Sequence, residues 1–132
     1  MSREVKNQAL ARIANGRTVR FVGSAKWNIG NQIVHVRFRT SPKSKEIFSY
    51  NINPNTLGAD FELWICGGVE SYYLFPIAIM KDIYSDPDAY VDRRHPEIRV
   101  AEVDTVTHQL LYGCGGKTQN VSKYFRATLD RF

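Results

Sequence analysis

The spacing of apolar side chains predicts one helix and three strands in the first 52 residues. Apolar residues recur at helical spacing between residues 2 and 14, and Asn15-Gly16 then supplies a left-handed residue that ends a helix. Short β-rich runs separated by turn residues predict strands at 18–22, 32–40 and 46–52, with 23–31 as a connection. This part of the chain is thus predicted to be a helix followed by strands of a sheet.

The rest of the chain shows a second β-rich region and one further amphipathic stripe. Two apolar runs separated by Gly67-Gly68 predict a hairpin, and Pro76 then precedes two helical turns. The predicted elements are the hairpin at 61–66 and 71–75, a helix at 77–84, an irregular acidic segment at 85–96, one or two strands within 98–112, and a C-terminal helix within 121–132.

This order of elements predicts an α+β (mixed α/β) fold in a single domain spanning residues 1–132. The length of 132 residues fits one domain that buries its own core. We expect a single central sheet of about five strands, flanked by the N-terminal and C-terminal helices.

The two faces of the strand at 32–40 differ in chemistry. Val34, Val36 and Phe38 alternate with polar positions and point to one side of the sheet. The opposite side carries Ile33 and three basic or potentially basic residues, namely His35, Arg37 and Arg39. Such a row of cationic side chains on one strand face indicates a surface that binds anions.

Charge is distributed unevenly along the chain. The net charge is +5, but residues 1–45 carry ten basic and one acidic side chain, whereas residues 46–104 carry four basic and eleven acidic ones. Residues 105–132 add four basic residues and one acid. A domain with a strongly basic third suits a polyanionic partner, and nucleic acid is the common one.

Composition excludes several other classes of protein. Two cysteines are too few for a disulfide framework, which indicates a reducing, cytoplasmic setting. No apolar run reaches the ~18 residues of a membrane span, and the charged first eight residues do not resemble a secretion signal. An aromatic content of 12% argues against disorder.

Familiar motifs for phosphate and metal binding are incomplete. Gly113–Thr118 ends in Gly-Lys-Thr, but a P-loop needs glycine where Leu111 stands, so we interpret this stretch as a turn before the C-terminal helix. The acidic residues at 82–92 lack the glycine of a calcium loop, and the three histidines lack zinc-ligand spacing. We therefore predict no metal site from motifs.

The stretch from about residue 17 to residue 83 resembles the PD-(D/E)XK nuclease superfamily, which includes restriction and homing endonucleases. The resemblance lies in the order of elements, in Lys26-Trp27-Asn28 before the strand at 32–40, and in the runs Ala59–Ile65 and Tyr72–Ile77, where a strand ends in proline before a helix. It implies a restriction-endonuclease-like fold and a site for a phosphodiester backbone.

The catalytic positions that this resemblance implies are occupied by other residue types. Asn28 stands where the family has a metal-binding aspartate, and His35-Val36-Arg37 stands in place of Glu-x-Lys. Asparagine and neutral histidine supply no negative charge for Mg²⁺, while arginine binds phosphate directly. The acids that remain available for a metal site are Glu4, Asp60 and Glu62.

The first hypothesis is a nucleic-acid-binding protein with a nuclease-like fold and a degraded active site, with DNA favoured over RNA. Trp27 would stack on an exposed base, and the other binding residues would be Arg17, Arg20, Lys26, His35, Arg37, Arg39, Lys43 and Lys45. The alternatives are an active Mg²⁺-dependent DNA endonuclease, and a protein-interaction or oligomer subunit. A homodimer fits both nucleic-acid functions, because symmetric sites are usually met by symmetric proteins.

Overall fold

A computed structural model describes residues 2–113 and 116–132, which form two helices, ten strands and three short 3₁₀ segments. The elements in chain order are α1 (Ser2–Ala14), β1 (Val19–Gly23), β2 (Lys26–Ile29), β3 (Gln32–Arg39), β4 (Ile47–Ile52), η1 (Pro54–Thr56), β5 (Phe61–Cys66), β6 (Tyr72–Pro76), α2 (Ile77–Ser85), β7 (Tyr90–Val91), β8 (Arg99–Asp104), β9 (Gln109–Gly113), β10 (Lys117–Asn120), η2 (Ser122–Tyr124) and η3 (Leu129–Arg131).

The mixed α+β class is confirmed, but the prediction of a single central sheet is wrong. The first sheet has the strand order β1-β2-β3-β5-β6, in which only β3 and β5 run parallel. A second, antiparallel sheet has the order β10-β9-β8-β4, with β7 added alongside β8. β4 belongs to the second sheet because it pairs along its whole length with β8. Local periodicity does not reveal this partner.

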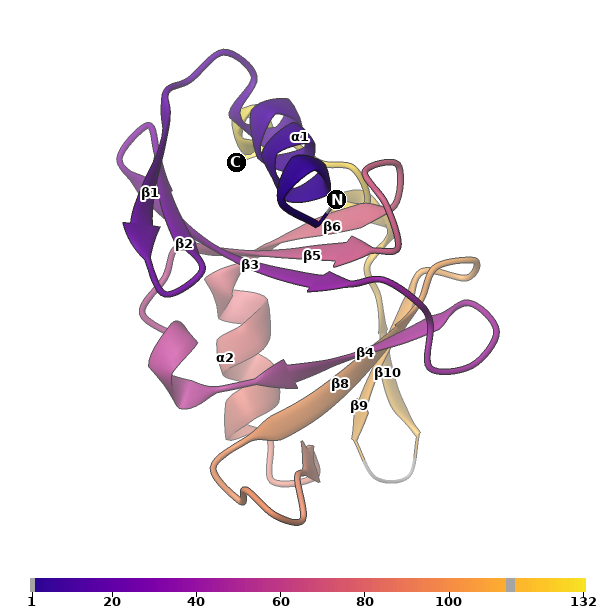
Figure 1. Cartoon of the computed structure of the whole chain (residues 1–132). Coiled ribbons are helices and arrows are strands. Elements are labelled where there is room, and N and C mark those ends of the chain that lie inside the picture. Colours follow the sequence, from indigo (N-terminus) through magenta and orange to yellow (C-terminus); the bar gives the residue numbers. More distant parts are fainter. Residues whose placement is uncertain (1, 114–115) are drawn as a thin grey trace.

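The first sheet is the middle layer of the molecule. Figure 1 shows α1 across one of its faces, and the second sheet with α2 against the other. On the α1 side, the buried residues Leu10 and Ile13 pack with Val34, Leu63 and Leu74 in one hydrophobic cluster. Strand β5 is buried at all six positions because both of its faces are covered.

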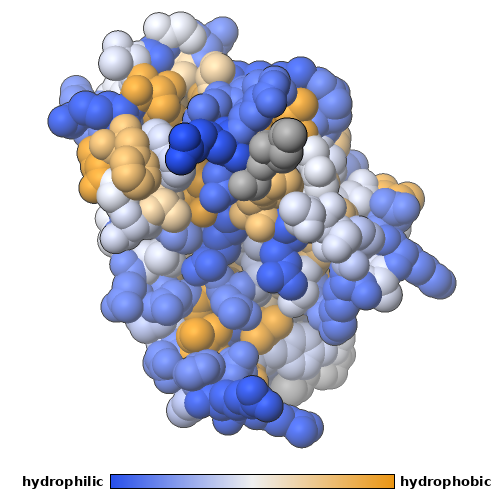
Figure 2. All heavy atoms as spheres, viewed as in Figure 1, coloured by the Kyte–Doolittle hydropathy of each residue, from blue (hydrophilic) through white to orange (hydrophobic). Residues whose placement is uncertain are grey.

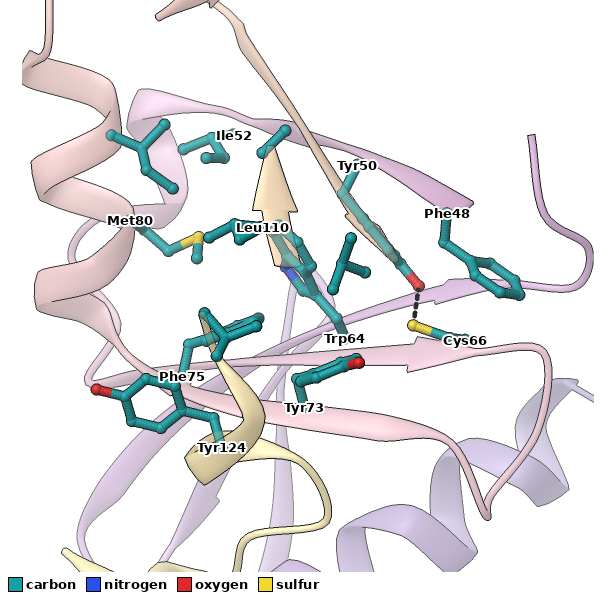
Figure 3. Close-up of a cluster of buried hydrophobic side chains, with 14 of the residues drawn as sticks. Phe48, Tyr50, Ile52, Trp64, Cys66, Tyr73, Phe75, Met80, Leu110 and Tyr124 are labelled. Carbon is teal, nitrogen blue, oxygen red and sulfur yellow. Dashed lines mark hydrogen bonds between the residues drawn. The ribbon is translucent and has the colours of Figure 1, made fainter. Parts of the chain in front are cut away.

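The core on the other side is rich in aromatic residues (Figure 3). Trp64 of β5 stacks on Tyr50 of β4 with ring centroids 4.4 Å apart, and Phe75 meets Trp64 edge-on at 5.0 Å. Met80 and Ile83 close this core from α2. These contacts hold the two sheets together. All aromatic residues of 61–75 are buried, so they belong to the core.

The predicted C-terminal helix is wrong. Residues 117–120 form strand β10, and two short 3₁₀ segments follow it. Arg126 has a φ of 55°, which interrupts a helix, and its backbone N–H donates to the carbonyl of Tyr72 in β6. The apolar residues Val121, Tyr124 and Leu129 are buried nonetheless. Pairing with β6 therefore overrides the helical spacing.

The predicted glycine turn that would precede this helix includes residues 114 and 115, which lie outside the described residues.

The segment at 23–31 is a strand rather than a connection. β2 lies between two tight turns, one at Ser24-Ala25 and one at Gly30-Asn31, and all four residues have φ between 52° and 71°. Two successive residues with positive φ are typical of the hairpin turn that matches sheet twist. Gly-Asn is a recognised signal for such a turn, whereas Ser-Ala is not. β1, β2 and β3 are therefore two successive hairpins.

None of the helices in the described part of the chain is long and apolar enough to cross a membrane.

Because both faces of β5 are buried, truncation of one of its side chains should destabilise the protein. Leu63 is completely buried between the first sheet and α1, so Leu63→Ala is expected to lower the free energy of unfolding by about 2–5 kcal/mol. Val106 is 68% exposed, and Val106→Ala should change it by less than about 0.5 kcal/mol. Urea unfolding of both variants measures the difference. Equal stabilities would contradict this description of the core.

Candidate functional site

The polar face of β3 is turned toward the second sheet. Because side chains alternate along a strand, His35, Arg37 and Arg39 share this face, while Val34 and Val36 pack toward α1. The parallel neighbour β5 places Glu62 directly beside His35. The predicted division of this strand into a hydrophobic and a cationic face is confirmed.

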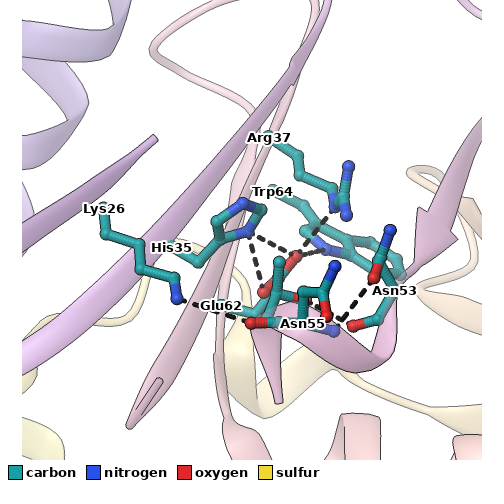
Figure 4. Close-up of polar contacts among 8 residues, drawn as sticks. Lys26, His35, Arg37, Asn53, Asn55, Glu62 and Trp64 are labelled. Atoms are coloured by element: carbon teal, nitrogen blue, oxygen red, sulfur yellow. Dashed lines mark hydrogen bonds and ion pairs between the residues drawn. The ribbon is translucent and has the colours of Figure 1, made fainter. Parts of the chain in front are cut away.

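Glu62 is the centre of the polar contacts on this face (Figure 4). The His35 Nδ1 atom lies 3.2 Å and 3.1 Å from the two carboxylate oxygens of Glu62. The Nε atom of Arg37 donates to Oε1 at 3.1 Å, and the indole Nε1 of Trp64 donates to the same oxygen at 3.3 Å. A single buried carboxylate thus joins β3 to β5.

Burial makes these contacts necessary. Glu62 and His35 are only 2% and 5% exposed. An isolated carboxylate at this depth would be strongly destabilising without a cation and hydrogen-bond donors. Arg37 contacts Glu62 through Nε only, so its two terminal nitrogens remain outside this contact. Glu62 therefore fixes the orientation of the Arg37 guanidinium.

The same face of β3 forms one wall of a polar cleft between the two sheets, with a volume of about 340 Å³. Opposite it, β4 contributes the polar residues Ser49 and Asn51. The cleft residues are Ala25, His35, Val36, Arg37, Phe38, Arg39, Ser49, Tyr50 and Asn51.

The inner wall of the cleft adds no charge of its own near neutral pH. The hydroxyl of Tyr50 donates to the carbonyl of Ile65 at 2.8 Å and lies 3.1 Å from the Sγ atom of Cys66. Burial raises the pKa of the Cys66 thiol to about 12, and it raises the pKa of Tyr50 above its ordinary value for the same reason. Both groups are therefore neutral, so the potential at the cleft depends on its basic side chains and on Glu62.

Four of the predicted binding residues come together here, namely Lys26, His35, Arg37 and Arg39. Lys26 lies opposite His35 in the β2–β3 register, and its Nζ atom is 3.5 Å from the carbonyl oxygen of Asn55. Asn53 holds the same loop, because its side chain accepts a hydrogen bond from the Asn55 N–H at 2.9 Å. Amide groups therefore border the cationic face beside η1.

The other predicted binding residues are placed elsewhere. Arg17 pairs with Asp130 at 2.7 Å, and Lys43 pairs with Glu102. Arg20 is exposed on the edge strand β1, and Lys45 is exposed in the turn before β4. Trp27 packs with the cluster on the α1 side of the sheet, opposite the cleft. The predicted basic surface is thus divided among several places.

The positions considered for catalysis do not form an acidic cluster. The Asn28 side chain accepts a hydrogen bond from the Asn31 N–H at 3.1 Å, and Asp60 accepts one from the Ile33 N–H at 2.8 Å. Glu4 is exposed on α1, across the sheet from Glu62. Within residues 2–113 and 116–132, no group of three histidine, cysteine, aspartate or glutamate residues is placed to hold a metal ion.

Sequence reasoning missed the role of Glu62 and the contribution of β4. Glu62 is the only charged residue within Phe61–Cys66, a strand that is buried throughout. A charge in such a run needs a partner, so this signal was present, but the identity of the partner depends on the β3–β5 register. Ser49 and Asn51 carried no comparable signal.

Comparison with known proteins finds no matching family model, no matching curated protein and no matching solved structure.

The contacts of Glu62 predict an unequal effect of two glutamate substitutions. Glu62→Ala should lower the free energy of unfolding by roughly 3 kcal/mol, because it leaves His35 and Arg37 without their buried anion. Glu62→Gln should have a free energy of unfolding between those of the wild type and Glu62→Ala, since the amide oxygen of glutamine still accepts one N–H.

Glu70→Ala is the matched control, because Glu70 has two basic partners as Glu62 does, namely Arg12 and Arg126, but is 66% exposed. It should be far less destabilising than Glu62→Ala. Chemical unfolding of the three variants tests the order. A Glu62→Ala protein as stable as Glu70→Ala would contradict the role given to this carboxylate.

Proposed function

We propose that the protein binds the phosphodiester backbone of a nucleic acid in the cleft between β3 and β4 and does not cleave it. The observation that carries the proposal is the row His35, Arg37 and Arg39 on one strand face, lining a polar cleft. Phosphate is the anion that best fits a strand of spaced cationic groups, because its charges repeat along the backbone.

The charge at the cleft supports an anionic ligand. Arg37, Arg39 and Lys26 are positive, and Glu62 is the only acid within hydrogen-bond contact of this group among the described residues. Neither Arg39 nor Lys26 forms an ion pair within residues 2–113 and 116–132. Their charge is therefore not neutralised by neighbouring acids, and an incoming phosphate meets a net positive face.

The geometry of Arg37 supports phosphate in particular. Its Nε–H is used by Glu62, so the guanidinium plane is fixed before a ligand arrives. A guanidinium presents several N–H donors in a planar fork that matches two phosphate oxygens. Ser49, Tyr50 and Asn51 of β4 line the opposite wall. Fixed donors lose less entropy on binding, which favours affinity.

The absence of an acidic cluster is the reason for proposing binding without cleavage. Metal-dependent phosphodiester hydrolysis needs carboxylates that hold Mg²⁺. Among the described residues, the buried Glu62 is already paired with His35 and Arg37, and Asp60 accepts a hydrogen bond from the backbone of β3. The nuclease-like site suggested by the sequence would then be one whose cation-holding face has become an anion-holding face.

The proposed partner is DNA rather than RNA. The proposed binding form is a homodimer, and the proposed location is the cytoplasm. A two-fold dimer would present two clefts to a two-fold symmetric site.

Loss of Arg39, which lines the cleft, together with Lys26, which lies beside it opposite His35, is expected to weaken DNA binding. Arg39→Gln combined with Lys26→Gln should raise the Kd for a short duplex about tenfold or more at low salt, since each lost charge removes a charged hydrogen bond. It should also reduce the slope of log Kd against log salt by about one per lost contact. Fluorescence anisotropy measures both quantities.

The matched control is Arg93→Gln combined with Arg94→Gln. These residues are exposed in the segment between β7 and β8, and the double variant loses the same net charge away from the cleft. Arg37→Lys is a third variant to test. It keeps a cation beside Glu62 but loses the planar guanidinium whose paired N–H groups match two phosphate oxygens. Equal losses in the cleft and control variants would show that net charge alone causes binding, and would contradict the proposal.

The absence of cleavage is a separate expectation. Supercoiled plasmid should stay intact when the protein is incubated with Mg²⁺ or Mn²⁺, because the described residues include no set of carboxylates placed to hold the ion. Gel electrophoresis over a time course checks this. Cleavage that EDTA abolishes and that Asp60→Ala removes would contradict the proposal and support an endonuclease.

A further inference from the structure

A second concave site lies on the other side of the first sheet, between α1 and the β1–β2 hairpin. It has a volume of about 600 Å³ and is larger than the cleft. Helix α1 lines one wall and the hairpin lines the other. The residues of this aromatic pocket are Arg3, Lys6, Asn7, Phe21, Ala25 and Trp27.

The hairpin wall is aromatic and open to solvent. Phe21 and Trp27 are direct partners in the β1–β2 register, and their rings lie 5.0 Å apart, tilted by 56°. Phe21 is 61% exposed, and its neighbour Val22 is 46% exposed. Figure 2 shows this group of hydrophobic residues over β1, bordered by hydrophilic residues over α1. A large exposed aromatic side chain next to a hollow indicates a contact surface rather than a core.

The helix wall is cationic. Arg3, Lys6 and Asn7 are spaced three and four residues apart, so they project from the same side of α1. Neither Arg3 nor Lys6 forms an ion pair within the parts of the chain that the structure describes. The pocket therefore offers two aromatic rings on one side and two positive charges with an amide on the other.

This combination fits a ligand that is flat, aromatic and anionic at once. A nucleotide has these properties, since its base stacks on aromatic rings and its phosphate binds lysine or arginine. A purely apolar ligand would make no ionic contact with Arg3 and Lys6. An acidic peptide would make no stacking contact with the exposed Phe21. Charge and shape together favour a nucleotide.

The aromatic pocket and the cleft adjoin at the tip of the hairpin. Ala25 lines both sites, and its carbonyl accepts a hydrogen bond from the Val36 N–H of β3 at 2.9 Å. A chain that binds along Arg37 and Arg39 and continues past this turn would meet the pocket that Trp27 lines. The turn is held in place by β3 itself.

We infer that the aromatic pocket binds an unpaired base, together with its phosphate, of the nucleic acid held in the cleft. The inference rests on the proposed function and extends it, because it assigns single-stranded or frayed nucleic acid as the preferred partner. Bases inside a duplex are stacked on one another and cannot reach Phe21 and Trp27. A free strand can stack them in the pocket with little sequence preference.

The test compares a short oligothymidylate with a blunt duplex of equal length, using wild-type protein, Phe21→Leu and Phe132→Leu. Phe132 is 50% exposed at the other end of the chain and is the control for the loss of one exposed ring. Phe21→Leu should raise the Kd for the single strand at least about fivefold, because one stacking contact is lost. It should leave the Kd for the duplex unchanged, and Phe132→Leu should change neither.

Each other outcome has a distinct meaning. Duplex binding in the cleft with no effect of Phe21→Leu on the single strand would overturn the inference and leave the proposed function standing. Binding of neither probe by the wild-type protein would overturn both. A wild-type dimer by light scattering that Phe21→Leu converts to a monomer would assign the pocket to a second copy of the chain, and would also overturn the inference.

Discussion

The buried carboxylate of Glu62 is the constraint on which the rest of the site depends. It lies in a strand covered on both faces, so its charge must be balanced by groups that reach it from the neighbouring strand. His35 and Arg37 do so only because β3 and β5 run parallel with these residues in register. The same contacts that satisfy Glu62 fix the orientation of Arg37 at the cleft. Stability and the proposed phosphate binding are therefore connected through one ion pair, Arg37–Glu62.

The two layers on either side of the first sheet give its faces different roles. On the α1 side, hydrophobic packing ends near the β1–β2 hairpin, where Phe21 stays exposed beside Arg3 and Lys6. On the opposite side, the aromatic core around Trp64 fills most of the space between the sheets, and the cleft opens where β3 and β4 separate. The cleft and the aromatic pocket therefore both lie at the edge of a hydrophobic core. The turn at Ala25 lines both of them.

Local pattern was sufficient for the parts of the fold in which a residue's neighbours in sequence decide its structure. Helix α1, strand β3 with its two faces, the β5–β6 hairpin and helix α2 were all predicted within one or two residues. One error is local, because the turns on either side of β2 were not predicted. The other errors concern partners distant in sequence. β4 pairs with β8 instead of joining the first sheet, and the C-terminal segment is held by β6 rather than forming a helix. For the same reason the cationic face of β3 was predicted, but its anion, 27 residues away from His35, was not assigned as a partner.

The central claim is that phosphate groups contact the cationic face of β3. The most direct measurement is a titration of isotope-labelled protein with duplex DNA, followed by NMR of backbone amides and arginine Nε–H groups. The account predicts shifts of the Arg37 Nε–H and of amides in 35–39 and 49–51, with little change in 93–97. Shifts confined to other surfaces, or no shifts at low salt, would contradict it.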